Sequence, residues 1–80
     1  MNEIEKHLNK LETRKRERVE MCMDDIRSRR IAPYHVKKLR GHRFFFRIRI
    51  EDQRITFYMD DDHIEILDVG KRNDNTYKNL

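Results

Sequence analysis

Residues 46–59, FRIRIEDQRITFYM, constrain the fold of this chain most, because apolar and polar side chains alternate in two runs around a short polar segment. Alternation with a period of two is typical of a β-strand with one buried face. If residues 52 and 53 form a two-residue loop, the runs pair as an antiparallel hairpin with Ile50 opposite Ile55. A slip of one residue would mix the two faces, so the segment predicts a hairpin of well-specified register.

This register separates the side chains completely, because directly opposed residues share a face of a hairpin. The apolar face carries Phe46, Ile48, Ile50, Ile55, Phe57 and Met59. The other face carries Arg47, Arg49, Glu51, Arg54, Thr56 and Tyr58. An ordinary half-exposed strand also alternates in this way, and Glu51 could pair with Arg54 near the turn. However, the face has no acidic residue beyond Glu51, and guanidinium groups beside tyrosine suit the phosphates and unstacked bases of single-stranded RNA.

A third strand is predicted over residues 63–69, after the acidic turn DDD. With residues 61 and 62 as its loop, Ile64 and Ile66 face apolar residues of the preceding strand and extend the apolar face. Leu67 and Val69 then have the opposite parity. Either a bulge re-aims the chain at this point or these two side chains line the far face.

Residues 2–29 are predicted to form a helical hairpin. Apolar residues recur at helical spacing in two stripes, Ile4 with Leu8 and Leu11, and Val19 with Cys22 and Ile26. The pattern breaks near Glu12 and Thr13, where Thr13 can cap a second helix. Because the apolar stripes can cover the apolar side of the hairpin, the predicted fold class is α+β, with an N-terminal helical hairpin packed on one face of a small three-stranded antiparallel sheet.

At 80 residues the chain is short enough for one domain, predicted over residues 1–80. The predicted parts are the helical hairpin (2–29), a basic connector (30–43), the antiparallel sheet (44–69) and a polar tail (70–80). The connector and tail add cations near the arginine-bearing face. The residues predicted to contact RNA are Lys37, Lys38, Arg40, Arg43, Tyr58 and Lys71.

Composition limits the class of protein. The formal net charge of +4 favours a polyanionic partner, and a chain that is only 36% hydrophobic has a small core that a partner would help to stabilise. The single cysteine, Cys22, excludes an intrachain disulfide framework and fits a reducing cytoplasm. The sequence has neither a membrane-spanning run nor a signal-peptide pattern, so the predicted location is cytoplasmic.

Metal and cofactor chemistry have little support. Three adjacent aspartates between strands are typical of a turn, and His35, His42 and His63 lack Cys or His partners at metal-ligand spacing. The sequence contains no Gly-rich phosphate loop and no nucleophile motif. No metal and no small-molecule cofactor are therefore predicted.

The order of these features resembles the RelE/ParE superfamily of toxins from toxin–antitoxin modules. The resemblance rests on KKLRG (37–41), on FRIRIEDQRITFYMDDDHIEILDVGKR (46–72) and on the nearby Tyr77, and it covers about residues 4–77. RelE-like members cleave mRNA in the ribosomal A site, where a ribose 2′-hydroxyl attacks the adjacent phosphate and leaves a cyclic phosphate. The resemblance implies a RelE-like toxin that inhibits translation as a ribosome-dependent endoribonuclease, with the ribosome, A-site mRNA and a cognate antitoxin as partners.

The resemblance also implies roles for individual residues. Arg47, Arg49 and Arg54 would hold and neutralise the scissile phosphate. Arg72 would stabilise the leaving group, and Tyr77 would stack on or orient a base. The ribosome would supply the geometry of the substrate.

The sequence departs from the family pattern at two points. RNases of the family can use Lys or another titratable group on the first strand of the hairpin, whereas this chain has Arg47 and Arg49, and arginine is a poor general base. In addition, the usual N-terminal strand is missing, which leaves a sheet edge that another chain could fill. Two alternatives therefore stay open: a non-catalytic RelE-fold protein that binds the ribosome or RNA, and a ParE-like inhibitor of DNA gyrase.

Overall fold

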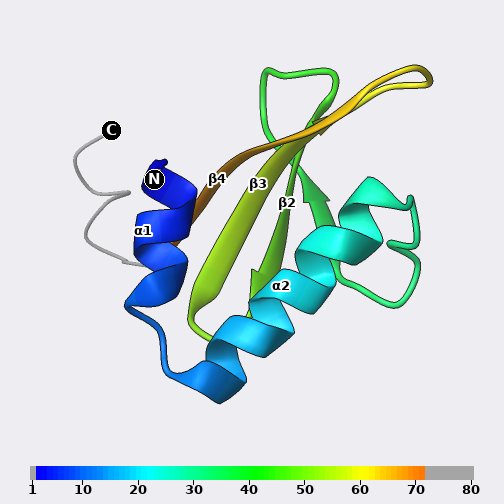
Figure 1. Ribbon diagram of the computed structural model, residues 1–80. Coiled ribbons are helices and arrows are strands. Elements are labelled where there is room, and N and C mark those ends of the chain that lie inside the picture. The colour runs from blue at the N-terminus through cyan, green and yellow to red at the C-terminus, as the bar shows by residue number, and fades with distance from the viewer. Residues whose placement is uncertain (1, 72–80) are drawn as a thin grey trace.

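The computed structural model describes residues 2–71 and shows a sheet with helices on one side. The elements within these residues are α1 (Glu3–Asn9), α2 (Thr13–Arg27), β1 (Val36–Lys38), β2 (Phe45–Ile50), β3 (Gln53–Met59) and β4 (Ile64–Lys71). The strands form an antiparallel sheet in the order β1-β2-β3-β4, and both helices lie on the same side of it (Figure 1). The predicted α+β architecture is confirmed.

The sheet has four strands among the described residues, whereas the sequence predicts three. The additional strand, β1, lies inside the predicted connector and pairs Val36 with Ile48. It is a short edge strand with a single apolar residue, so alternation could not reveal it. At the other edge, β4 continues to Lys71, which places Gly70 and Lys71 in the sheet rather than in the predicted tail.

The helices break where the apolar pattern breaks. Asn2 caps α1, since its Oδ1 accepts a hydrogen bond from the Glu5 backbone N–H at 2.8 Å. The chain leaves α1 at Lys10 and enters α2 at Thr13, so the predicted junction is confirmed. The predicted capping role of Thr13 is wrong, because the N-cap residue is Glu12 and its side chain makes no capping hydrogen bond.

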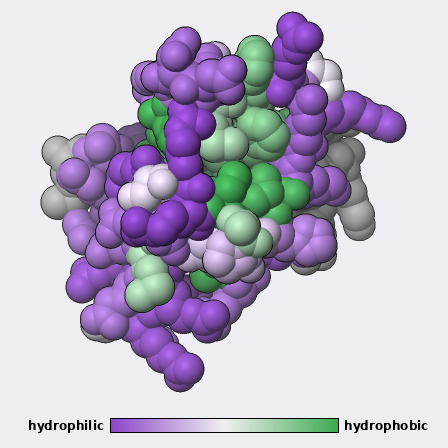
Figure 2. Space-filling view, turned by 90° about the vertical axis from the view of Figure 1, so that its right-hand side faces the viewer, coloured by the Kyte–Doolittle hydropathy of each residue, from purple (hydrophilic) through white to green (hydrophobic). Residues whose placement is uncertain are grey.

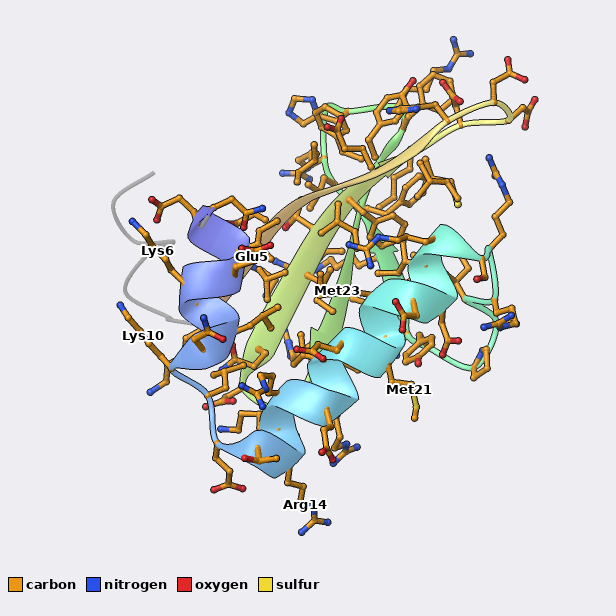
Figure 3. The ribbon with its side chains drawn as sticks, in the orientation of Figure 1. Glu5, Lys6, Lys10, Arg14, Met21 and Met23 are labelled. Atoms are coloured by element: carbon orange, nitrogen blue, oxygen red, sulfur yellow. The ribbon has the colours of Figure 1, made fainter. Side chains whose placement is uncertain are left out.

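The core lies between the helices and the apolar face of the sheet. Its buried residues include Leu8, Val19, Cys22, Met23, Ile26, Ile48, Ile55, Phe57 and Val69. Figure 3 shows Met23 pointing toward the sheet and Met21 pointing away from it, and Met21 is 65% exposed. Burial raises the pKa of the Cys22 thiol to about 11, so this cysteine is a small core residue, as the helical pattern indicates.

The β2–β3 hairpin keeps the predicted faces but not the predicted partners. Its turn is formed by Glu51 and Asp52, so Ile48 rather than Ile50 lies opposite Ile55. The pairing is displaced by two residues, and a displacement by an even number leaves every side chain on its predicted face. Glu51 has a φ of 54° in the turn, and its carboxylate lies 3.4 Å from the guanidinium of Arg18 on α2.

The displaced turn brings Gln53 into β3, where it is 1% exposed on the apolar face. Its buried amide is satisfied from both sides: His7 Nε2 donates to Gln53 Oε1 at 2.6 Å, and Gln53 Nε2 donates to Asp52 Oδ1 at 3.0 Å. Asp52 also lies 3.0 Å from Lys15 Nζ. The hydrogen bond from Gln53, followed by that from Lys15, lowers the pKa of the Asp52 carboxyl. These contacts tie the hairpin turn to both helices.

A bulge separates the two halves of β4. Thr56 lies opposite Asp68 and Phe57 lies opposite Ile66, so the intervening Leu67 has no opposite residue and is 42% exposed. Val69 returns to the apolar face, where it is 4% exposed. Of the two alternatives left by the sequence, the bulge is therefore the one observed.

Candidate nucleic-acid interface

The side of the sheet that faces away from the helices carries most of the predicted arginines. The strand register places the following residues on it, and we refer to them as the cationic face: Lys37, Arg47, Arg49, Arg54, Thr56 and Tyr58. Asp68 and Glu65 share this side, because they lie opposite Thr56 and Tyr58 on β3. The expectation that no acidic residue other than Glu51 belongs to the face is therefore wrong.

Positive residues are direct neighbours on the cationic face. Arg49 lies opposite Arg54 across β2 and β3, and Lys37 lies opposite Arg47 across β1 and β2. Like charges directly opposite each other destabilise a sheet, whereas opposite charges stabilise it. The acidic residues Asp68 and Glu65 lie along β4, so the positive neighbours of β1, β2 and β3 form an area with the charge to hold an anion.

The cationic face contains a hollow of about 390 Å³ lined by His35, Lys37, Arg47 and Arg49. Arginine can contact two phosphate oxygens at once, and lysine adds a compact charge. His35 was not among the predicted site residues. The sequence pattern that could have indicated it is the spacing of two residues between His35 and Lys37, because side chains two residues apart in an extended chain lie on the same side.

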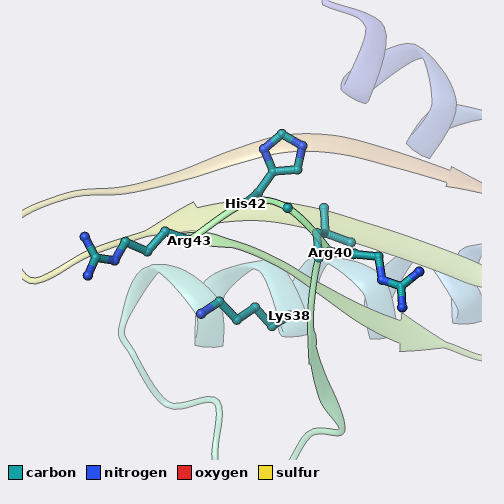
Figure 4. Close-up of a pocket in the computed structure, with 6 residues that line it drawn as sticks. Lys38, Arg40, His42 and Arg43 are labelled. Atoms are coloured by element: carbon teal, nitrogen blue, oxygen red, sulfur yellow. The ribbon is translucent and has the colours of Figure 1, made fainter.

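The β1–β2 loop forms a second basic surface. Lys38, Leu39, Arg40, Gly41, His42 and Arg43 line a hollow of about 470 Å³. The side chains of Arg40 and Arg43 point away from each other (Figure 4), so the two do not clamp a single group. Lys38 lies opposite Phe46 and therefore has the parity of the apolar face.

The remaining predicted site residues do not join the cationic face. Lys71 lies opposite Gln53, a residue of the apolar face, at the far end of β4. Arg72 and Tyr77 lie outside the described residues, so their predicted roles stay predictions.

Tyr58 is held by the β3–β4 turn. Its hydroxyl donates a hydrogen bond to the Asp60 carboxylate, and Asp60 Oδ1 accepts the backbone N–H groups of Asp62 and His63 at 2.9 and 2.7 Å. The Tyr58–Asp60 hydrogen bond raises the pKa of the phenol and lowers that of the carboxyl. The Tyr58 hydroxyl is thus engaged within the turn. Asp60 therefore stabilises the turn. The described residues contain no group of three or more side chains that could hold a metal ion.

Comparison with known proteins supports the fold. No family model matches the chain, and no curated protein matches it. Among solved structures, a chain of a RelB–RelE antitoxin–toxin complex from Methanococcus jannaschii is similar, with a TM-score of 0.75 and 20% identity over 100% of this chain and 95% of that chain. At this identity the likeness shows a shared fold. No helix among the described residues is long and apolar enough to cross a membrane.

Proposed function

We propose that this chain is a RelE-like toxin that cleaves mRNA in the ribosomal A site and is neutralised by an antitoxin. The observation that carries the proposal is the hollow in which Lys37, Arg47 and Arg49 meet on a face of like-charged neighbours. The similarity in fold to a chain of an antitoxin–toxin complex supports the same assignment. The antitoxin would be a small protein that covers the cationic face or adds a strand at the edge formed by β1 or β4.

In the proposed reaction, the scissile phosphate lies in the hollow against Arg47 and Arg49. The 2′-hydroxyl of the preceding ribose loses its proton to a base and attacks the phosphorus, and the bond to the 5′-oxygen of the next nucleotide breaks. That oxygen takes up a proton from water and becomes a 5′-hydroxyl, and a 2′,3′-cyclic phosphate remains on the other fragment. Negative charge grows on the phosphoryl oxygens in the transition state. Fixed guanidinium groups that need no reorganisation stabilise that charge. Arg54 lies opposite Arg49 and adds to the same field.

The reaction also needs a group that removes the proton of the 2′-hydroxyl. Arginine stays protonated at physiological pH and cannot serve. Imidazole is the side chain that changes charge between about pH 5 and 8, and His35 brings one into the hollow that contains Arg47 and Arg49. We therefore assign His35 as the general base in this proposal.

The test is primer extension on mRNA in translating ribosomes, with Arg14→Ala as the matched control. Arg14 is an exposed arginine of α2 whose side chain points away from the sheet (Figure 3). In the presence of the wild type or Arg14→Ala, primer extension should show cuts in the A site at codon boundaries. Arg49→Ala should lose about 10²- to 10³-fold in cleavage rate, the usual effect of removing one group that stabilises transition-state charge. Intact mRNA at micromolar wild-type protein would contradict the proposal.

A non-catalytic binder of ribosomal or messenger RNA is the second candidate. It is favoured by the arginines at both first-strand positions of the hairpin, which bind phosphate well and accept protons poorly. The His35→Gln variant distinguishes an endonuclease from a non-catalytic binder. An endonuclease should keep its salt-sensitive co-sedimentation with ribosomes and lose cleavage, whereas a binder shows the same co-sedimentation and no cleavage in either form.

A further inference from the structure

Aromatic rings gather at one end of the cationic face. We define the aromatic cluster as His42, Phe44, Phe45, Tyr58 and His63. The ring centroid of Tyr58 lies 5.7 Å from that of Phe45 and 5.8 Å from that of Phe44, and the ring centroid of His63 also lies 5.7 Å from that of Tyr58. His42 stacks on Phe45 at 4.8 Å with an interplanar angle of 30°. The cluster joins the β1–β2 loop to the β3–β4 turn.

Burial in the core does not account for these rings. Of the three consecutive phenylalanines, Phe46 packs against the core, stacked at 5.7 Å on the buried Phe57. Phe45 shares the opposite side of the sheet with Tyr58, and Phe44 is 40% exposed. The guanidinium of Arg43 lies 5.9 Å from the centroid of the Phe44 ring, within the range of a cation–π contact. The cluster thus presents aromatic surface to solvent beside a flanking cation.

Charge divides the cationic face into two ends. At the aromatic end, Glu65 lies opposite Tyr58 and the Asp60 to Asp62 turn follows directly, so a phosphate is disfavoured there. Arg47 stands two residues from Phe45 on the same strand and the same side, a separation of about 7 Å. The exposed ring of Phe44 belongs to the same end of the face through its contact with Tyr58, whose ring centroid lies 5.8 Å away. A ligand with a planar uncharged group next to an anionic group matches both ends, and a nucleotide has this composition.

We propose that the aromatic cluster is a stacking site for one nucleobase of an RNA strand whose phosphate is held by Arg47 and Arg49. This inference rests on the proposed contact between RNA and the cationic face and specifies how the strand lies on it. Phe44 offers the exposed ring, and Tyr58 positions it through the ring contact and its own hydrogen bond to Asp60. Stacking on an aromatic ring tolerates any base, so the site fixes the path of the strand rather than its sequence.

The test measures fluorescence anisotropy of the full chain with two labelled oligomers of equal length, one an ordinary oligoribonucleotide and one abasic throughout. The wild type should bind the base-containing oligomer about tenfold more tightly, which is the size of effect expected from one stacked base. Phe44→Leu, which keeps an apolar side chain without a ring, should abolish that difference and leave the affinity for the abasic oligomer unchanged. Phe44→Tyr should preserve the difference. Leu67→Ala, at an exposed leucine outside the cluster, is the control and should behave as the wild type.

A second readout uses an oligomer with 2-aminopurine at successive positions, because stacking quenches its fluorescence. The wild type and Phe44→Tyr should quench the 2-aminopurine fluorescence, and Phe44→Leu should not. Equal affinity of the wild type for the two oligomers, with a steep salt dependence for both, would overturn the stacking site and leave the proposed phosphate contact standing. Loss of the base preference in Phe44→Tyr would also overturn it. A wild type that binds neither oligomer at low salt would overturn the proposed function and the stacking site together.

Discussion

Ile48 and Arg49 are neighbours in β2 that point to opposite sides of the sheet, and this difference gives a direct test of the architecture. Ile48 is 0% exposed, so Ile48→Val removes one methylene from a packed site. The transfer free energy of that group is about 0.8 kcal/mol, and with the cavity left behind we expect a loss of about 1 kcal/mol in the free energy of unfolding. For a domain of this size, that loss lowers the melting temperature by about 4–8 °C.

Arg49→Ala should change the free energy of unfolding in the opposite direction. Arg49 is exposed and lies opposite Arg54, so its removal relieves a like-charge contact across the strands. We expect the free energy of unfolding to rise by about 0.2–1 kcal/mol. Binding should change in the other direction, because one phosphate contact is lost. The slope of log affinity for single-stranded RNA against log salt should fall by about 0.7.

Thermal and urea denaturation followed by circular dichroism measure both changes, and an unchanged urea m-value would show that the unfolded state is not altered. If Arg49→Ala lowered the melting temperature as much as Ile48→Val does, Arg49 would contribute packing rather than charge, and its placement on the solvent side would be wrong. An unchanged melting temperature in Ile48→Val would contradict the burial of Ile48 in the core.

Three further predictions concern polar and buried groups. His7→Leu leaves the buried Gln53 Oε1 without its donor and should cost about 1–3 kcal/mol of unfolding free energy, measured by urea denaturation against a Lys6→Ala control on the exposed side of α1. Because the folded state lowers the pKa of Asp52, its contribution is present above the unfolded pKa near 3.8 and is lost as pH falls through the folded value; Asp52→Asn should make the urea midpoint less dependent on acid pH. Cys22 is fully buried and its pKa is about 11, so a thiol reagent should modify it only as fast as the chain unfolds, and fast modification in native buffer would contradict its placement in the core.

The sequence was sufficient to assign the faces of the hairpin but not its partners. Alternation has a period of two, so it distinguishes odd from even displacements of the strand pairing. It does not distinguish a pairing displaced by two residues from the correct one. What sets the partners is the turn, and the turn includes Glu51 because Gln53 belongs to β3. A glutamine at a buried position is favourable only with a hydrogen-bonding partner. Its partner is His7, 46 residues away in the sequence, and no local pattern reveals such a contact.

The residues of the candidate site were likewise predicted only in part. The arginines of β2 and β3 were placed correctly on one side, because their parity alone determines it. The contributions of His35, Asp68 and the aromatic cluster were missed. Each depends on a feature that alternation does not encode: the short edge strand β1 beside His35, the bulge at Leu67, and the approach of two loops that are far apart in the sequence.

The two sides of the sheet are under different physical constraints. On the helical side, Ile48, Ile55 and Phe57 are fully buried, and any change in their volume alters the stability of the whole domain. On the other side, the Arg49–Arg54 and Lys37–Arg47 neighbours oppose folding. A small core must offset that repulsion in the free protein, whereas a bound polyanion removes it and stabilises the fold by its own binding free energy. The proposed binding of a phosphate-rich partner would therefore stabilise the arrangement that costs free energy in the free protein.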